Sequence, residues 1–409
     1  MLSAERIMQR CDSLARHSEL AGGLTRVFLS PESRAANELV MGWMREAGMQ
    51  AGLDAIGNVR GRYEGARPGL PCLMLGSHLD TVRDAGRYDG MLGVISAIEC
   101  VDALNADKKR LPFALEVVGF GDEEGVRFGT TLLGSRAVAG NFDFSALQVK
   151  DANNITMEQA LRDFGLAPQS IAGVAKKKGD VLAYAELHIE QGPVLEAEGL
   201  PVGVVTAING FSRLRVTLSG AAGHAGTVPM NLRRDALVAA AECITTVERN
   251  AKAHSEVVGT VGRIEASPGA INVIPGKVMF TVDIRAPKDN LRLACVDSVQ
   301  RDIRNICKQR KIDVEIQNLQ EFGVTQCAPW LMAQMDRAVA AEGLKVRRLP
   351  SGAGHDGMAI RAIADIAMLF VRCKGGISHN PAEAITPEDA ASGARVLLHF
   401  IKEFHAVPA

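Results

Sequence analysis

The sequence lacks a net charge of either sign. It holds 46 lysine and arginine residues against 47 aspartate and glutamate residues, which leaves a formal charge of -1. Proteins that bind nucleic acid or an anionic membrane through electrostatics rely on a basic surface. We therefore expect neither nucleic acid nor a membrane among its partners, and a small molecule or another protein is the better candidate for a substrate.

Long apolar runs and paired cysteines are absent as well. No stretch approaches the ~18 consecutive apolar residues of a transmembrane helix. Residues 1–20 are typical of an amphipathic helix and lack the apolar core of a signal peptide. The eight cysteines are scattered without a CxxC pair, which is typical of reduced, mostly buried thiols. We therefore expect a cytoplasmic protein.

What is present is enough chain for two domains, because 409 residues exceed the size at which one core stops growing. Strand-like and helix-like patterns alternate in the first half and again near the end, which favours an α/β fold with a mixed, largely parallel sheet. Apolar runs at 71–76, 113–121 and 181–189 are typical of buried strands, and polar residues stand at the end of each. Ligands bind outside the carboxyl ends of such strands, so these ends could form one site.

The pattern changes near residue 210. From there the order is strand, helix, strand, strand, helix, strand, which is the split βαβ arrangement of a small, ferredoxin-like α+β domain. Its two ends can lie close together, as the ends of an inserted domain must. The sequence therefore predicts a larger domain made of residues 1–209 and 325–409, with a small domain inserted at 210–324.

The loop GSHLDTVRDAGRYDG carries the first candidate site residues. His78 and Asp80 stand two apart, so both point the same way on an extended segment. Asp80 could support a metal-binding His78 or bind the metal itself, and a loop of solvated charges is the alternative. Asp89 precedes a glycine and a helix-like run, where it could bind a metal or form a turn or a helix cap.

Two adjacent carboxylates, Glu123 and Glu124, follow the second apolar run. They repel each other unless a cation or a shared proton intervenes. One could bind a metal while the other acts as a general base, and an exposed acidic turn is the alternative. His188 lies within the third apolar run, where a core histidine is the ordinary interpretation, and His379 lies in a glycine-rich loop after another apolar run.

Together these residues supply three histidines and at least three carboxylates in one domain. A mixed set of nitrogen and oxygen ligands suits zinc, manganese or cobalt better than calcium or magnesium. The set is too large for one catalytic zinc ion that keeps an open position, but it fits two metal ions that share a carboxylate.

Over nearly its whole length the chain resembles the hydantoinase/carbamoylase amidases. These include allantoate amidohydrolases, N-carbamoyl-L-amino acid hydrolases and β-ureidopropionases, and they belong to a wider clan of two-metal aminoacylases and carboxypeptidases. The resemblance rests on these strings, in order: GSHLDTV, YDGMLGV, DEEGVRF, LHIEQGPVLE, GHAGTVPM, RRDAL, INVIPGK, DIRAP, SGAGHD and GISHNPAE.

The resemblance implies a role for each metal-site residue. One ion would be bound by His78, Asp89 and His188, and the other by Asp89, Glu124 and His379, with Asp89 bridging the two. Glu123 would be the general base, and Asp80 the carboxylate behind His78. The ions would be zinc or manganese, with cobalt or nickel also compatible.

The resemblance also implies substrate-binding residues that spacing alone does not suggest. His224, in the inserted domain, would reach the partner's active site in a homodimer and stabilise the oxyanion. Asn272 and Arg285 would hold the substrate carboxylate, while Gln191 and His355 would make further substrate contacts. The segment NGFSRLRV departs from the pattern of related enzymes near the hinge, which bears on substrate choice or closure.

The activity implied is hydrolysis of the ureido C–N bond of a small carboxylate, and the inserted domain would serve as lid and dimerisation domain. Allantoate is the first choice of substrate, which would yield ammonia, CO2 and ureidoglycine and place the enzyme in purine degradation. An N-carbamoyl-L-amino acid or a β-ureido acid is the alternative. An aminoacylase or dipeptidase on the same scaffold, or a catalytically silent binding protein, are the competing hypotheses.

Overall fold

The computed structural model describes residues 2–406, which form two compact units. The large unit comprises the chain up to Thr206, Gln326–Leu349 and the chain from Ala353 onward. The small unit comprises Ala207–Thr325 and Pro350–Gly352. The sequence suggested an insertion at 210–324, and it gave no sign that the segment Pro350–Gly352 would join the small unit.

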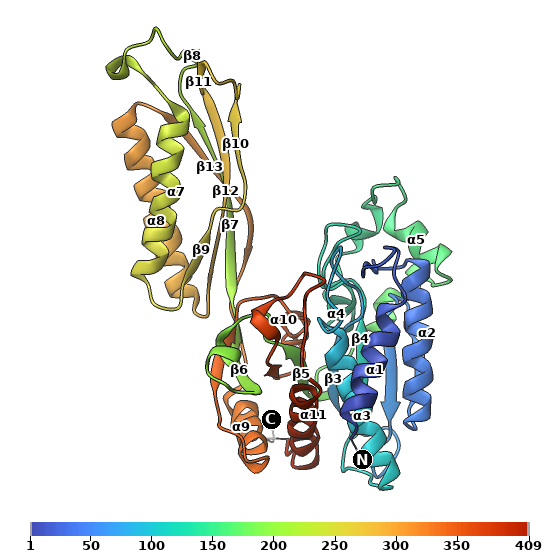
Figure 1. The fold of residues 1–409 in the computed structure, drawn as a ribbon. Helices are drawn as coiled ribbons and strands as arrows, with labels where there is room; N and C mark the ends of the chain where they lie inside the picture. Colours follow the sequence, from blue (N-terminus) through green and yellow to red (C-terminus); the bar gives the residue numbers. More distant parts are fainter. Residues whose placement is uncertain (1, 407–409) are drawn as a thin grey trace. The chain divides into compact units, whose positions relative to one another are not determined.

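The large unit is built on a nine-stranded sheet (Figure 1). The strand order is β1-β2-β4-β3-β5-β16-β6-β14, and β15 pairs with β6. The neighbours β4, β3, β5 and β16 run parallel, whereas β1, β2 and β6 pair antiparallel. The strands are β1 (Gln50–Leu53), β2 (Val59–Tyr63), β3 (Cys72–His78), β4 (Ala114–Phe120), β5 (Val181–Ile189), β6 (Val202–Ile208), β14 (Thr325–Gln326), β15 (Arg348–Ser351) and β16 (Ile366–Val371).

The central parallel strands are buried along nearly their whole length, as expected for a sheet covered on both faces. One face packs against α3 (Met91–Ala106), whose residues are almost all buried, and α11 (Pro387–Lys402) packs on α3. Toward the other face, α10 (Gly357–Ile360) contacts β5 and β16. The remaining longer helices of this unit are α1 (Ala4–Ala15), α2 (Pro31–Glu46) and α9 (Pro329–Ala341).

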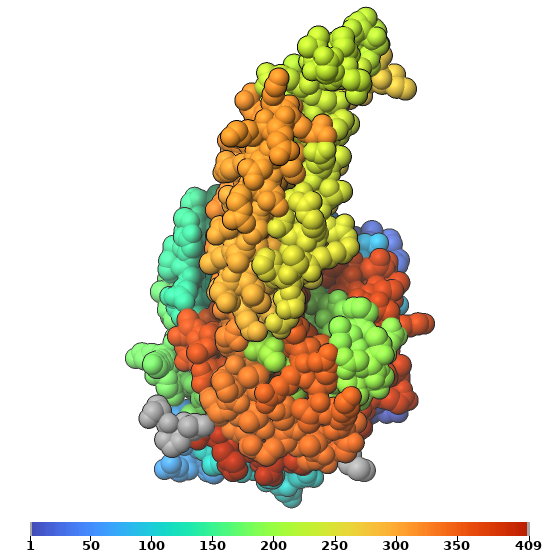
Figure 2. Space-filling model, turned by 90° about the vertical axis from the view of Figure 1, so that its left-hand side faces the viewer, coloured from blue at the N-terminus to red at the C-terminus, as the bar shows by residue number. Residues whose placement is uncertain are grey.

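The small unit is an antiparallel sheet with two helices packed against it. The strand order is β10-β12-β7-β13, with β9 also paired to β12, and a two-stranded ribbon joins β8 to β11. Figure 2 shows α7 in yellow and α8 in orange side by side. The elements are β7 (Gly210–Ser219), β8 (Gly223–His224), α7 (Ala236–Ala253), β9 (Val258–Thr260), β10 (Ile264–Ser267), β11 (Val273–Ile274), β12 (Lys277–Ala286), α8 (Asp289–Arg310) and β13 (Asp313–Phe322).

The fold class expected from the sequence is confirmed: a mixed, largely parallel α/β sheet accompanies a small α+β part. In β7 the alternation places Leu214, Val216 and Leu218 in the core under the helices, while Arg213 lies on the opposite face. All eight cysteines are buried and free. Within residues 2–406, no helix has both the length and the apolar character needed to cross a membrane.

Candidate metal centre

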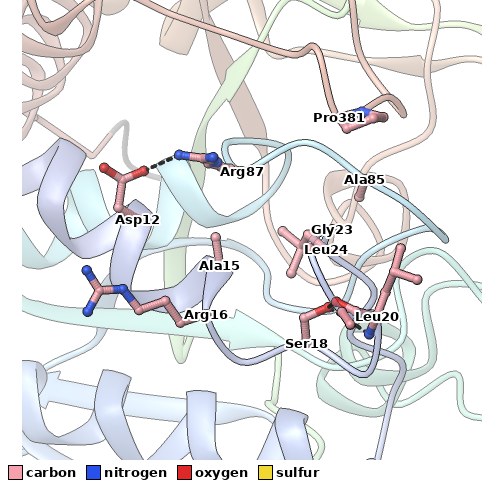
Figure 3. A pocket seen from close by; sticks show the side chains of 12 residues that line it. Asp12, Ala15, Arg16, Ser18, Leu20, Gly23, Leu24, Ala85, Arg87 and Pro381 are labelled. Carbon is pink, nitrogen blue, oxygen red and sulfur yellow. Dashed lines mark hydrogen bonds and ion pairs between the residues drawn. The ribbon is translucent and has the colours of Figure 1, made fainter.

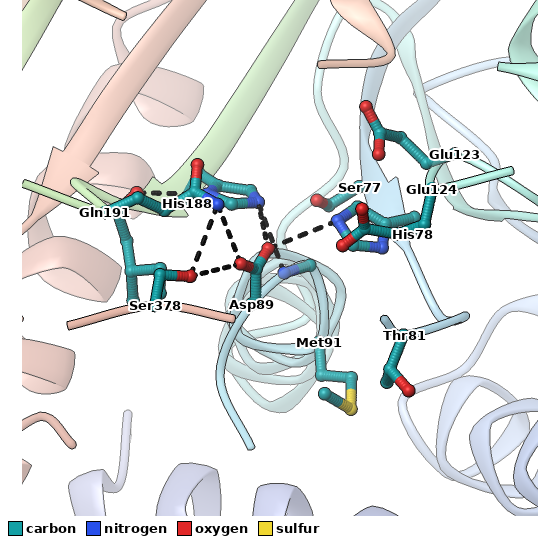
Figure 4. A network of polar contacts seen from close by, with 12 residues as sticks. Ser77, His78, Thr81, Asp89, Met91, Glu123, Glu124, His188, Gln191 and Ser378 are labelled. Atoms are coloured by element: carbon teal, nitrogen blue, oxygen red, sulfur yellow. Dashed lines mark hydrogen bonds and ion pairs between the residues drawn. The ribbon is translucent and has the colours of Figure 1, made fainter. Parts of the chain in front are cut away.

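Three histidines surround the carboxylate of Asp89 in the large unit. Figure 4 shows two of them, His78 and His188, beside Asp89. Oδ1 of Asp89 lies 3.4 Å from Nε2 of His78 and 3.2 Å from Nε2 of His188. Oδ2 of Asp89 lies 3.4 Å from Nε2 of His379. His78 ends β3 and His188 lies near the end of the parallel neighbour β5, so the sheet itself brings these rings to one edge.

The arrangement offers two overlapping sets of metal ligands. His78, Asp89 and His188 each place a ligand atom within 4.8 Å of the others, and so do Asp89, Glu124 and His379. Asp89 belongs to both sets because its two oxygens face different histidines. Mixed nitrogen and oxygen donors around a shared carboxylate fit a pair of divalent cations.

The tautomers of the two buried histidines suit metal binding. Nδ1 of His78 lies 3.0 Å from the carbonyl oxygen of Asp80, and Nδ1 of His188 lies 3.0 Å from that of Ile189. A carbonyl oxygen only accepts, so each Nδ1 carries a proton, and Nε2 is the nitrogen left to bind a metal ion. Backbone hydrogen bonds therefore hold both rings with Nε2 toward Asp89, the orientation that a shared metal site needs.

Asp80 fixes the pair of glutamates. Its Oδ1 accepts the backbone N–H of Glu123 and its Oδ2 accepts that of Glu124, both at 3.1 Å. The same carboxylate lies 3.9 Å from Nδ1 of His78, which is farther than the backbone carbonyl of Asp80. Asp80 thus contacts His78 mainly through its main chain, while its carboxylate sets the position of the two glutamates.

The electrostatics of the site favour a cation. Burial raises the pKa of Glu124 to about 8, and the carboxylates of Asp89 and Asp80 act in the same direction. Burial likewise raises the pKa of Glu123 well above its usual range. Charged carboxylates crowded in a buried site are stabilised by a cation bound among them. The residues present therefore fit the divalent ions that the sequence suggested.

The turn between Asp89 and α3 requires glycine at position 90. Its φ is 76°, and a Cβ there would lie 2.5 Å from Cε1 of His78. Gly90 is also the N-cap of α3, and its N–H lies 3.2 Å from Nε2 of His188, to which it donates. Asp89 therefore does not cap the helix, which was the alternative left open by the sequence, and its carboxylate points at the histidines instead.

Gln191 and His355, for which the resemblance implies substrate contacts, both lie against the metal-site residues. Nε2 of Gln191 donates to Oδ2 of Asp89 at 2.7 Å and lies 3.4 Å from Nε2 of His379. His355 is buried, and its ring packs against His188 with 4.6 Å between centroids. Burial lowers the pKa of His355 well below its usual range, so this imidazole is neutral.

Two further carboxylates at the site were missed by sequence reasoning. Glu186 is buried and accepts hydrogen bonds from Ser77 at 2.8 Å and Tyr184 at 2.9 Å. Glu383 is buried behind Asp89, and burial, followed by the charge of Asp89, raises its pKa to about 7. Glu186 stands two residues before His188 on one face of β5, and Glu383 lies in the quoted string GISHNPAE, so each had a signal in the sequence.

The remaining predicted residues lie in the small unit. His224 is on β8, directly opposite Val273 of β11, and Asn272 precedes that strand. Both His224 and Asn272 are exposed. Arg285 donates to Asp283 from Nε at 2.9 Å and from Nη2 at 3.0 Å, and to the carbonyl oxygen of Gly352 from Nη1 at 2.8 Å.

Two cavities lie away from the candidate metal ligands, one in each unit. Arg285 lines one of about 580 Å³ together with Arg213, Asp283 and Thr281. The other, of about 670 Å³, lies in the large unit, where Asp12 and Arg87 form an ion pair of 2.8 Å in its wall (Figure 3). None of the candidate metal ligands lines the second cavity, so it is separate from the metal centre.

Comparison with known proteins places the chain among metal-dependent hydrolases. The family model described as peptidase family M20/M25/M40 matches residues 74–403. An N-carbamoyl-L-amino acid amidohydrolase of Geobacillus stearothermophilus is 42% identical over 402 residues, covering 98% of each chain. A probable allantoate deiminase of Oryza sativa subsp. japonica is 41% identical over 96% of this chain and 87% of its own. A solved hydantoinase/carbamoylase family amidase from Burkholderia multivorans has a TM-score of 0.92 at 32% identity, covering 98% of this chain and 97% of its own.

Proposed function

Because this chain belongs to peptidase family M20/M25/M40, we propose that it is a two-metal amidohydrolase that cleaves the ureido C–N bond of a small carboxylate. It is a hydrolase acting on carbon–nitrogen bonds. The observation that carries the proposal is the Asp89 carboxylate, whose two oxygens face three histidines beside the Glu123–Glu124 pair. Relatives named for ureido substrates along nearly the whole chain support the bond type.

Allantoate is the substrate we propose first, with release of ammonia, CO2 and ureidoglycine in purine degradation. Its second ureido group needs polar partners, and Arg285 shares its cavity with the polar groups of Arg213, Asp283 and Thr281. An N-carbamoyl-L-amino acid or a β-ureido acid is the alternative, since relatives named for carbamoyl amino acids and for allantoate are about equally similar to this chain, at 42% and 41% identity.

The chain holds the residues that the reaction needs. His78, Asp89 and His188 would bind one divalent ion, and Asp89, Glu124 and His379 would bind a second. Zinc or manganese would serve, with cobalt or nickel also compatible, and the ions would lower the pKa of the attacking water. Glu123 takes the proton from the attacking water and delivers it to the departing amine. Asp80 holds Glu123 in place through its backbone N–H.

The small unit supplies groups for the substrate. A guanidinium fork matches a carboxylate, so Arg285 would hold the substrate carboxylate with Asn272. His224 would donate to the oxyanion, a contribution of ~3 kcal/mol per donor. Gln191 and His355 would make further substrate contacts, Gln191 after it turns away from Asp89.

We also propose a homodimer in the cytoplasm, in which His224 completes the partner's site. Near His224 and Asn272, the side chains of Met230, Leu232 and Ile271 are 76%, 69% and 103% exposed, which suits a surface covered by a second copy. Mixed dimers of Glu123→Gln and His224→Ala subunits test the arrangement. Activity in the mixed dimers is expected if His224 acts on the partner's site, and none is expected if it acts within its own subunit.

Ammonia release measured in parallel from several substrates tests the proposed activity. The manganese-loaded protein is offered allantoate, N-carbamoyl-L-amino acids, N-carbamoyl-β-alanine and ureidoglycolate, with dipeptides and N-acyl amino acids as controls. We expect turnover of allantoate and none of the controls. Turnover of carbamoyl amino acids alone would replace allantoate by the alternative, and turnover of the controls alone would contradict ureido hydrolysis.

A further inference from the structure

Glu383 is a buried carboxylate that none of the proposed roles uses. It is 5% exposed, and within residues 2–406 no lysine, arginine or histidine forms an ion pair with it. A buried carboxylate without a cationic partner is costly unless its hydrogen bonds are well made or a cation is bound nearby. The position of Glu383 therefore calls for an explanation beyond packing.

The hydrogen bonds of Glu383 all lead to the metal-site loops. Oε1 accepts the backbone N–H of Tyr88 at 2.8 Å and that of Asp89 at 3.2 Å. Oε2 lies 3.1 Å from the hydroxyl of Ser378. That hydroxyl lies in turn 2.5 Å from Oδ2 of Asp89, and Ser378 is the residue before His379.

Glu383 therefore ties together the loop before α3 and the loop after β16. One loop carries Asp89, which belongs to both sets of candidate ligands, and the other carries His379. Gly86 also packs closely against this side chain, since a Cβ on Gly86 would lie 2.3 Å from Cβ of Glu383. A side chain in this position fixes the backbone of one ligand and, through Ser378, the direction of the oxygen that faces the other.

We infer that Glu383 is a positioning residue of the metal centre, which orients the Asp89 carboxylate and sets its separation from His379. This inference rests on the proposed two-metal site. Groups that hydrogen-bond to metal ligands typically change metal affinity by about 10- to 100-fold when they are removed. Glu383 contacts the backbone of Asp89, so both ions should be affected. Of the two carboxylate oxygens of Asp89, the Ser378 hydroxyl contacts only Oδ2, so only the ion shared with Glu124 and His379 should be affected.

The test is a titration of the metal-free full-length protein with Mn²⁺, with free ion measured by electron paramagnetic resonance. We expect Glu383→Ala to weaken both binding steps by about 10- to 100-fold. Glu383→Gln keeps one oxygen for the two backbone N–H groups, so it should recover most of the affinity. Ser378→Ala should weaken one step and leave the other unchanged.

Glu99→Gln is the matched control. Glu99 is fully buried in α3 and bound by Arg6 and Arg10, so its substitution should lower the unfolding midpoint measured in chelator without changing the affinity for Mn²⁺. Equal loss of affinity in Glu99→Gln and Glu383→Ala would overturn the inference, because it would show a general loss of stability. Folded Glu383→Ala that binds both ions as tightly as the unaltered protein would also overturn it.

The outcome does not depend on the substrate. If Glu383→Ala fails to fold, Glu383→Gln and Ser378→Ala decide the matter, and unchanged affinity in both would overturn the inference. An unaltered protein that binds two Mn²⁺ ions but releases no ammonia would contradict the proposed activity while leaving the positioning role supported by the affinities. An unaltered protein that binds no Mn²⁺ would overturn both.

Discussion

Asp80→Asn separates two roles for this residue. If the Asp80 carboxylate chiefly supported His78, the substitution would weaken metal binding. The structure instead places that carboxylate on the backbone N–H groups of Glu123 and Glu124, at 3.1 Å each, while His78 bonds to the main-chain carbonyl of Asp80. Asparagine has one acceptor oxygen where aspartate has two. Its amide N–H₂ would therefore face the backbone N–H of Glu123 or Glu124, and that N–H would lose its acceptor.

The magnitude follows from the lost hydrogen bond. Leaving one buried N–H without an acceptor costs about 1–3 kcal/mol. If misplacing Glu123 raises the activation free energy of proton transfer by this amount, kcat falls by roughly 5- to 150-fold, since 1.36 kcal/mol corresponds to a factor of ten.

Steady-state ammonia release and Mn²⁺ titration of the same preparation check this expectation. We expect kcat to fall while the binding step of the ion held by His78 stays close to that of the unaltered protein, because the carbonyl that supports His78 is unchanged. Any loss of affinity should fall on the ion held by Glu124, whose N–H bonds to the altered side chain. An unchanged kcat at saturating metal, together with a 10- to 100-fold loss of affinity for the ion held by His78, would refute the reasoning and assign the carboxylate to His78.

Three further predictions concern the general base Glu123, the carboxylate-binding Arg285 and the pH dependence of stability. Glu123→Gln should lower kcat by about 10²- to 10⁴-fold without loss of bound metal, and retained turnover would remove Glu123 from its role. Arg285→Lys should raise KM by roughly 10- to 150-fold with little change in kcat, because lysine lacks the guanidinium fork that could bind the substrate carboxylate and that now donates to Asp283 and Gly352. A fall in kcat without a rise in KM would argue against a role of Arg285 in binding the substrate carboxylate. Without metal, the pKa of Glu124 is about 8 and that of Glu383 about 7, whereas an unperturbed glutamate has a pKa of 4.5. Between these values the folded protein holds protons that the unfolded chain releases, so the temperature midpoint of unfolding in chelator should fall as pH rises from about 5 to 8. Saturating Mn²⁺ should remove that fall, and a midpoint that rises over this range in chelator would contradict it.

Much of the fold could be predicted from sequence patterns. The runs that became β3, β4 and β5 are fully or almost fully buried, so each shows up as a mostly apolar stretch of strand length. The order of strands and helices in the small unit was equally clear, since β7 and β12 alternate between core and opposite face. The resemblance to hydantoinase/carbamoylase amidases is confirmed by the family match and by structures of that family.

Only part of the candidate site could be predicted from the sequence. Local spacing singles out His78, Asp80 and Asp89, but it does not tell which atoms of Asp80 face His78, because the turn of the loop decides this. Glu383 acts across 294 residues of sequence on the N–H of Asp89, and no local pattern reports such a contact. Likewise, SGAGHD does not reveal that His355 is buried against His188, which depends on how α10 packs on β5.

The positions of the bound ions test the central claim most directly. Crystals of the Mn²⁺-loaded protein, measured at the manganese absorption edge, locate the ions independently of any substrate. We predict two anomalous peaks that share Asp89, one beside His78 and His188 and the other beside Glu124 and His379. A single peak, or a peak held by Glu186, His188 and His355, which also lie within ligand distance of one another, would contradict the account.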